Sequence, residues 1–244
     1  MNEIGMRHRP IFSRFRDLSP DALNVEYQVH TVQTDGEATV DEILMVARER
    51  KIGALAFTEH VRRDTKWFPD FVSDVRERAA GFPDLRVYVG CETKAMDRDG
   101  TLDISSGILE SSDIVLGSVH RFPDGDGGYL DFKALSPEQF AETEFRLAIG
   151  MVRHAPIDVL AHPGGMYERR HGAFPEEHFR ELMIGTLDRG IAIEINSSYL
   201  VDFANFIMLC DEINPFVSIG SDAHKLNELG ACRDMLRKMG MGKQ

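Results

Sequence analysis

Five short apolar segments of the chain each run into a histidine, and this pattern constrains the fold more than any other feature of the sequence. The segments end at His30, His60, His120, His162 and His224. In the first segment, Tyr27 and Val29 fall on one face of a strand by period-two alternation, while Gln28 and His30 fall on the other. A buried polar face is costly unless another group satisfies it. We therefore expect the segment ends to meet at one mouth of the fold and to hold metal ions there.

Strand-like segments alternate with amphipathic helical segments. The predicted strands cover residues 24–30, 54–57, 85–90, 114–119, 157–161, 191–196 and 216–220. The predicted helices cover residues 40–51, 70–80, 137–152, 175–189, 203–213 and 226–239. This alternation predicts an α/β fold with a parallel sheet and right-handed crossovers. About seven such units without a visible linker predict a distorted seven-stranded (β/α)7 TIM-like barrel, with its chemistry at the C-terminal mouth.

The barrel domain is predicted to span residues 21–244, after an N-terminal extension. Residues 1–20 are polar and irregular, so we expect them to lie on the surface or to be disordered, or to carry an oligomer contact. Residues 93–112 predict a loop or a small ribbon. Residues 121–131, rich in glycine and aspartate, predict a mobile loop beside the mouth.

Composition narrows the classes of function. The formal net charge of −12 argues against broad nucleic-acid binding, which relies on a basic face. No apolar run reaches the ~20 residues of a membrane span, and no signal-peptide core is visible, so we expect a cytoplasmic protein without membrane contact. The three cysteines have no Cys-x-x-Cys spacing, which makes a disulfide framework or a four-cysteine zinc site a poor interpretation.

Carboxylates join the histidines at the predicted strand ends. The candidate ligands are His30, Asp35, His60, Glu92, His120, His162, Asp222 and His224. Imidazole and carboxylate together suit zinc, manganese or iron. These ligands exceed what one ion can use, so two or three divalent ions are implied. Such ions can orient a phosphoryl group and neutralise its developing charge.

At this point the sequence resembles the PHP (polymerase and histidinol phosphatase) family of metal-dependent phosphoesterases. The resemblance spans about residues 24 to 240. Its motifs stand here as Gln28-Val29-His30 with Thr34-Asp35-Gly36, Thr58-Glu59-His60, Gly90-Cys91-Glu92, Gly117-Ser118-Val119-His120, Ala161-His162-Pro163 and Ser221-Asp222-Ala223-His224. The family fold is a distorted seven-stranded barrel, which agrees with the interpretation reached from the alternation of elements.

The resemblance implies three metal positions. The first would use Gln28, His30, Glu92 and Asp222; the second Glu92, His120 and His162; and the third Asp35, His60 and His224. It also implies catalytic roles for Glu92 as the bridging ligand and for Asp222 or His224 in proton transfer. The chain departs from the family at Gln28, where the family has histidine, and an amide oxygen is usually a weaker ligand than imidazole.

Basic residues near the predicted mouth are candidates for binding a phosphate. Arg121 follows His120, and Arg169, Arg170 and His171 follow His162. Arginine grips phosphate through two parallel hydrogen bonds. The spacing between His120 and His162 resembles the histidinol-phosphatase branch of the family.

The sequence therefore predicts a phosphomonoesterase that acts on a small phosphorylated, histidinol-phosphate-like metabolite through attack by a metal-bound hydroxide. One alternative is a phosphodiesterase or exonuclease that trims oligonucleotides by the same chemistry. Another is a non-catalytic scaffold of the same fold, weakened at Gln28. A homo-oligomer is compatible with all three.

Overall fold

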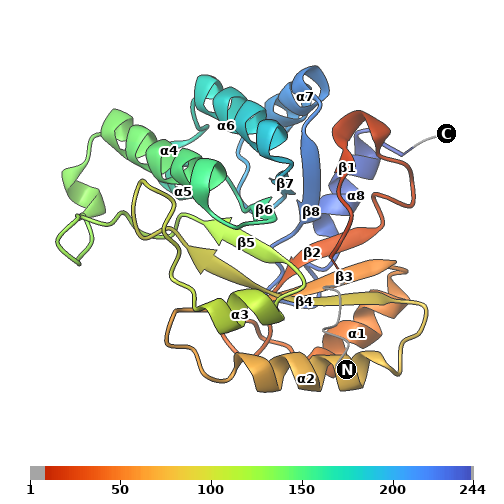
Figure 1. Cartoon of the computed structure of the whole chain (residues 1–244). Coiled ribbons are helices and arrows are strands. Elements are labelled where there is room, and N and C mark those ends of the chain that lie inside the picture. Colours follow the sequence, from red (N-terminus) through yellow and green to blue (C-terminus); the bar gives the residue numbers. More distant parts are fainter. Residues whose placement is uncertain (1–8, 243–244) are drawn as a thin grey trace.

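The computed structural model describes residues 9–242 and has a single eight-stranded sheet (Figure 1). Its strands are β1 (Ser13–Arg14), β2 (Val25–Val29), β3 (Ala54–His60), β4 (Arg86–Lys94), β5 (Val115–Ser118), β6 (Val159–Leu160), β7 (Ala192–Asn196) and β8 (Phe216–Gly220). The order across the sheet is β1-β8-β7-β6-β5-β4-β3-β2. All neighbouring pairs from β2 to β8 are parallel, and β1 is antiparallel to β8.

The α/β class and the parallel sheet are confirmed, but the predicted strand count of seven is wrong. The eighth strand is β1, which lies inside the predicted N-terminal extension and pairs Ser13 with Val217 and Arg14 with Phe216. Two residues give no alternating pattern, so no strand signal exists there. The extension carries a further contact, because Phe15 in the 3-10 helix η1 (Phe15–Asp17) is buried in the core. The proposed domain boundary at residue 20 stays a prediction.

The two remote edges of the parallel run meet beside the mouth. Val29 and Ala223 form an isolated parallel bridge, in which the His30 N–H donates to the Ala223 carbonyl at 2.9 Å and the Ala223 N–H donates to the Gln28 carbonyl at 3.0 Å. In the described part of the chain no regular ladder joins β2 to β8. The closed barrel therefore stays a prediction, although this bridge places the residues after β8 next to those after β2.

Helices connect the parallel strands and lie outside the sheet (Figure 1). They are α1 (Val40–Glu49), α2 (Phe68–Ala79), α3 (Ser106–Ser111), α4 (Pro137–His154), α5 (Gly165–His171), α6 (Glu176–Arg189), α7 (Phe203–Ile213) and α8 (Ala231–Lys238). Two of these helices, α1 and α4, begin with a capping box. Thr39 accepts a hydrogen bond from the Glu42 N–H and forms a capping box, as Ser136 does with Gln139. No helix within residues 9–242 is both long and apolar enough to cross a membrane.

Three of the helices differ clearly from the predicted elements. Helix α3 interrupts the predicted loop 93–112, although an antiparallel bridge between Ala95 and Leu102 does form a small ribbon there. Four residues separate the end of β6 from helix α5, which lies in a stretch for which no helix was predicted. Helix α8 begins at Ala231 and not at 226, because Gly230 adopts a positive φ of 77° that ends the preceding turn.

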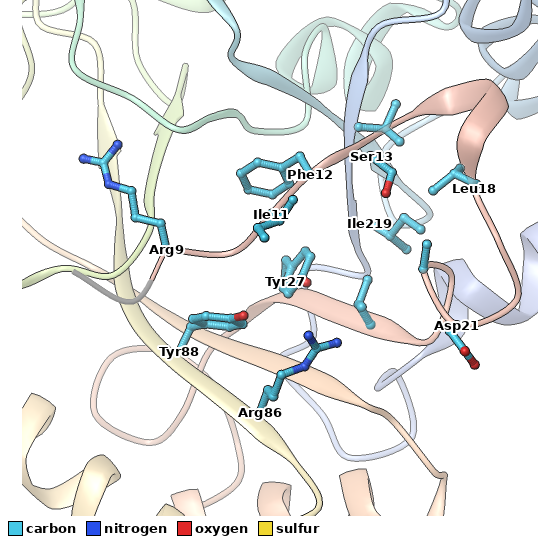
Figure 2. A pocket seen from close by; sticks show the side chains of 13 residues that line it. Arg9, Ile11, Phe12, Ser13, Leu18, Asp21, Tyr27, Arg86, Tyr88 and Ile219 are labelled. Atoms are coloured by element: carbon cyan, nitrogen blue, oxygen red, sulfur yellow. The ribbon is translucent and has the colours of Figure 1, made fainter. Parts of the chain in front are cut away.

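A pocket of about 350 Å³ opens near the starts of the strands (Figure 2), and none of the candidate ligand histidines lines it. Side chains from the N-terminal segment, such as Phe12, face Tyr27, Tyr88 and Ile219 across it. His60 and Glu92 lie at the opposite ends of β3 and β4. The N-terminal segment therefore covers the end of the sheet remote from the candidate chemistry.

Candidate metal centre

The predicted ligands come together at the carboxyl ends of the strands. His60 is the last residue of β3 and is paired in register with Glu92 on β4. His120 and His162 each lie two residues beyond the ends of β5 and β6, and Asp222 follows β8 by the same interval. Parallel strands end at one edge of a sheet, so this placement follows from the topology. The structure brings together side chains that are far apart in the sequence.

Glu92 lies at the centre of the cluster and is almost completely buried. Its Oε1 is 2.8 Å from His162 Nε2 and 2.9 Å from His120 Nε2. Its Oε2 is 3.3 Å from both His30 Nε2 and His60 Nδ1. One carboxylate therefore faces two groups of imidazoles with its two oxygens, as a bridging ligand would.

A second group surrounds Asp35, at the exposed side of the cluster. Asp35 Oδ2 is 3.3 Å from His60 Nε2, and Asp35 Oδ1 is 3.4 Å from His224 Nε2. The turn that brings Asp35 back towards the strand needs Gly36, since a Cβ there would lie 2.3 Å from the His30 carbonyl oxygen. Glu59 holds the same turn by accepting hydrogen bonds from the Thr31 N–H at 2.8 Å and from the Thr34 hydroxyl.

Several buried polar atoms in the cluster have no hydrogen-bond partner. They are both ring nitrogens of His30 and Oδ1 of Asp222. His30 Nε2 and Asp222 Oδ1 lie 3.1 Å apart, yet neither makes a hydrogen bond. Buried donors and acceptors are normally paired, so unpaired polar atoms that converge need another partner. Within the described residues, three sets place their ligand atoms within 4.8 Å of one another: His30/Asp35/His60/His224, His60/Glu92/His120 and His30/Glu92/Asp222. The residues present fit divalent ions.

The ionisation of the cluster reflects its mixture of charges. Burial would raise the pKa of Glu92, but the charges of His120 and His60 and the hydrogen bonds from His120 and His162 hold it well below the usual range. Burial would lower the pKa of His162, but Glu92 raises it to about 9. The same balance raises the pKa of His30 well above its usual value, through Asp222 and Glu92. Without ions, protons on imidazole therefore balance the carboxylates.

A pocket of about 390 Å³ opens over this cluster. Among its lining residues are Asp35, His60, His120, Asp222 and His224, together with Arg121, Arg169, Arg170 and Tyr199. Within residues 9–242, neither Arg121 nor Arg169 forms an ion pair with an acidic residue. Arg170 is held by the Met166 carbonyl at 2.9 Å. His171 does not line this pocket and packs against Phe140 and Tyr167 instead.

Tyr199 is a pocket residue that the sequence patterns did not single out. Its ring stacks on His162 at 4.4 Å between centroids, and the Arg169 guanidinium carbon lies over the Tyr199 ring, 3.9 Å from its centroid. Tyr199 follows β7, so its place after a strand end is the only sequence signal that it carries. Glu194, on the same strand, accepts a hydrogen bond from the His162 N–H at 2.7 Å.

Comparison with known proteins agrees with these observations. The PHP domain model matches residues 26–198. The chain is 25% identical over 225 residues to a protein named "Probable phosphatase" from Caldicellulosiruptor bescii, covering 86% of this chain and 83% of that protein. It is 26% identical over 219 residues to a protein of the same description from Shewanella sp. (strain MR-4), covering 84% and 78%.

A solved structure shares the fold. The crystal structure of histidinol phosphate phosphatase from Lactococcus lactis, complexed with zinc, L-histidinol and phosphate, superposes with a TM-score of 0.69. Sequence identity is 16%, and the match covers 88% of this chain and 91% of that one. Since the PHP domain model matches well over half of the sequence, and its range includes His30, Glu92 and His162, the chain belongs to the PHP domain family.

Proposed function

We propose that this chain is a metal-dependent phosphomonoesterase that hydrolyses a small phosphorylated metabolite of the histidinol phosphate kind. The observation that carries the proposal is the convergence of seven ligand-type side chains around Glu92 under a pocket that also contains Arg121 and Arg169. The names of the relatives support a phosphatase, and the histidinol phosphate phosphatase fold supports a substrate of that size.

The ligand assignment follows the contacts within the cluster. Glu92, His120 and His162 would hold one ion, and Asp35, His60 and His224 another, with His30 and Asp222 between them. Ions bound there supply a Lewis acid for the phosphoryl oxygens and lower the pKa of water. Side chains of the pocket would bind the substrate and transfer the proton.

The pocket walls would orient the substrate. Arg121 and Arg169 are placed to receive the phosphate, because both line the pocket beside the candidate ligands and neither pairs with an acidic residue within residues 9–242. Arg170 donates a hydrogen bond to the Met166 carbonyl, and its guanidinium carbon lies 4.8 Å from the centroid of the Phe132 ring. We therefore assign Arg170 to the wall of the pocket and not to phosphate binding. Asp222 or His224, both of which line the pocket, would deliver the proton to the leaving group.

The test is release of inorganic phosphate from small phosphomonoesters with added manganese or zinc. The Glu92→Gln variant keeps the size of the side chain and removes its charge, and we expect kcat/KM to fall at least about 100-fold. Glu110→Gln, an exposed change on α3, is the matched control and should keep full activity. Activity that survives both chelation and Glu92→Gln would overturn the proposal.

The same assay separates monoester from diester substrates. A net charge of −12 disfavours a long nucleic-acid path, so short oligonucleotides should be cleaved far more slowly than phosphomonoesters. Faster cleavage of oligonucleotides would replace the monoesterase with the diesterase.

A further inference from the structure

Gln28 lies fully buried at the base of the metal centre, where the family resemblance leads one to expect a histidine. Its carboxamide makes two hydrogen bonds. Nε2 donates to Glu92 Oε2 at 3.1 Å, and Oε1 accepts from Asn196 Nδ2 at 3.2 Å. The side chain therefore turns its N–H donor, and not its oxygen, towards the carboxylate at the centre of the site.

The neighbours of Asn196 determine this orientation. The Ser198 N–H donates to Asn196 Oδ1 at 2.8 Å, which leaves only Nδ2 of Asn196 to face Gln28. Asn196 Nδ2 also donates to Glu194 Oε2 at 3.1 Å. Turning the Gln28 amide over would place two N–H donors against each other and its oxygen against a carboxylate oxygen, and buried groups of this kind are costly when unpaired.

The hydrogen bonds form a closed ring that returns to Glu92. From Gln28 it passes through Asn196 to Glu194, whose Oε2 accepts from the His162 N–H at 2.7 Å. The His162 ring then reaches Glu92, with Nε2 2.8 Å from Oε1. Both oxygens of Glu92 are thus held by members of one buried ring.

We propose that Gln28 is a positioning residue for Glu92 and not a metal ligand, so that the chain tightly binds one ion fewer than the same site with an imidazole at position 28. An N–H donor aimed into the site repels a cation, whereas an imidazole lone pair attracts one. The position next to Gln28 then keeps only His30, Glu92 and Asp222. The inference rests on the proposed function only in that the site binds ions.

Counting tightly bound ions decides between the two roles. Wild type, Gln28→Leu and Gln28→His would be loaded with zinc, freed of weakly bound metal by gel filtration and measured by mass spectrometry of the metal. A positioning role predicts the same number of ions in wild type and Gln28→Leu, and one more in Gln28→His. Gln28→Leu should also release its ions at about 10- to 100-fold lower concentration of a competing chelator, because Glu92 has lost the hydrogen bond from Gln28.

Exposed Gln33 provides the matched control, since Gln33→His adds an imidazole outside the ring and should add no ion. Loss of one ion in Gln28→Leu, or no gain in Gln28→His, would overturn the positioning role. If Gln28→Leu does not fold, the gain or its absence in Gln28→His still decides. A failure of the proposed function looks different, because it is read as an absence of phosphomonoester hydrolysis, whereas the ion counts of wild type, Gln28→Leu and Gln28→His do not depend on which substrate is cleaved.

Discussion

At the residue scale, the site depends on side chains that hold unusual positions. His162 and Asp222 both have positive φ, 26° and 49°, although neither is glycine. Such backbone is uncommon and costs of order 1–3 kcal/mol. In both cases the residue follows a strand end, and the turn aims the side chain at the shared centre near Glu92 and His30. The fold thus accepts local strain where the candidate ligands lie.

Arg169 is the residue on which we expect substrate binding to depend most. Its guanidinium stacks on Tyr199 and has no acidic partner in the described chain. Hydrogen bonds to charged groups contribute about 1.5–3 kcal/mol, so Arg169→Ala should raise KM for a phosphomonoester about 10- to 100-fold. Steady-state kinetics would measure this.

The control for that change is Arg146→Ala, which removes an exposed arginine paired with Glu142 on α4. It should leave KM unchanged. An Arg169→Ala variant with wild-type KM would move the phosphate site elsewhere, with Arg121 the next candidate.

At the scale of elements, helix α5 is joined to α4 by a buried carboxylate. Glu144 Oε1 accepts from the Met166 N–H at 3.0 Å, and Oε2 accepts from the Tyr167 N–H at 2.7 Å. These are N–H groups of the first turn of α5, which have no partner within their own helix. Because α5 carries Arg169, this contact orients the wall of the pocket.

Burial raises the pKa of Glu144 to about 8, against the opposing effect of its two backbone hydrogen bonds. A raised carboxyl pKa means that the folded chain holds this proton more tightly than the unfolded chain does. Its contribution to stability is complete below pH 4.5 and is lost as the pH rises to about 8. As the pH rises from 4.5 to about 8, wild type should lose stability that Glu144→Gln does not lose. The melting temperature of Glu144→Gln minus that of wild type should therefore increase by at least about 3 °C across this pH range.

Thermal unfolding at several pH values would test this. The control is Glu177→Gln, an exposed change on α6, whose melting temperature should depend on pH as that of wild type does. Parallel curves for wild type and Glu144→Gln would mean that Glu144 is ionised at neutral pH in the folded chain.

At the scale of the whole molecule, the candidate metal centre joins the ends of the strands. Residues that follow β2, β5, β6 and β8 lie around Glu92 of β4. The raised pKa values of His30 and His162 mean that protons stabilise the ion-free fold below pH 6.5. For His162 this stability is lost as the pH rises through about 9.

Zinc should therefore stabilise the chain more at pH 8.5 than at pH 6, because ions must displace those protons at the lower pH. At an ion concentration about 100 times Kd, the gain in unfolding free energy is about 2.7 kcal/mol. Melting curves with zinc and with chelator at both pH values would measure it. An equal zinc effect at both pH values would show that these histidines bind the ion without releasing protons.

Some features of the whole molecule could be predicted from sequence patterns, and others could not. The ends of the strands were predictable because apolar runs stop where a polar side chain must face a site, and the ligand-type residues from His30 to His224 lie at those ends. Strand β1 and helix α5 were not predictable. Each exists through contacts with distant elements, β8 for the strand and Glu144 for the helix. Tyr199 was missed for the same reason, since a tyrosine in a loop has no local pattern that distinguishes it.

The amino-acid sequence alone therefore determined which residues are apolar, where strands and helices alternate, and which side chains can bind ions, because these are local properties of chemistry and period. Only the tertiary structure decided what those side chains do to one another. Gln28 is the clearest example. The residue type provides a carboxamide, but the hydrogen bonds of Ser198 and Asn196 orient it so that its N–H faces Glu92. The direction of the Gln28 hydrogen bonds depends on Asn196, which lies 168 residues away in the sequence. No local sequence pattern contains that information.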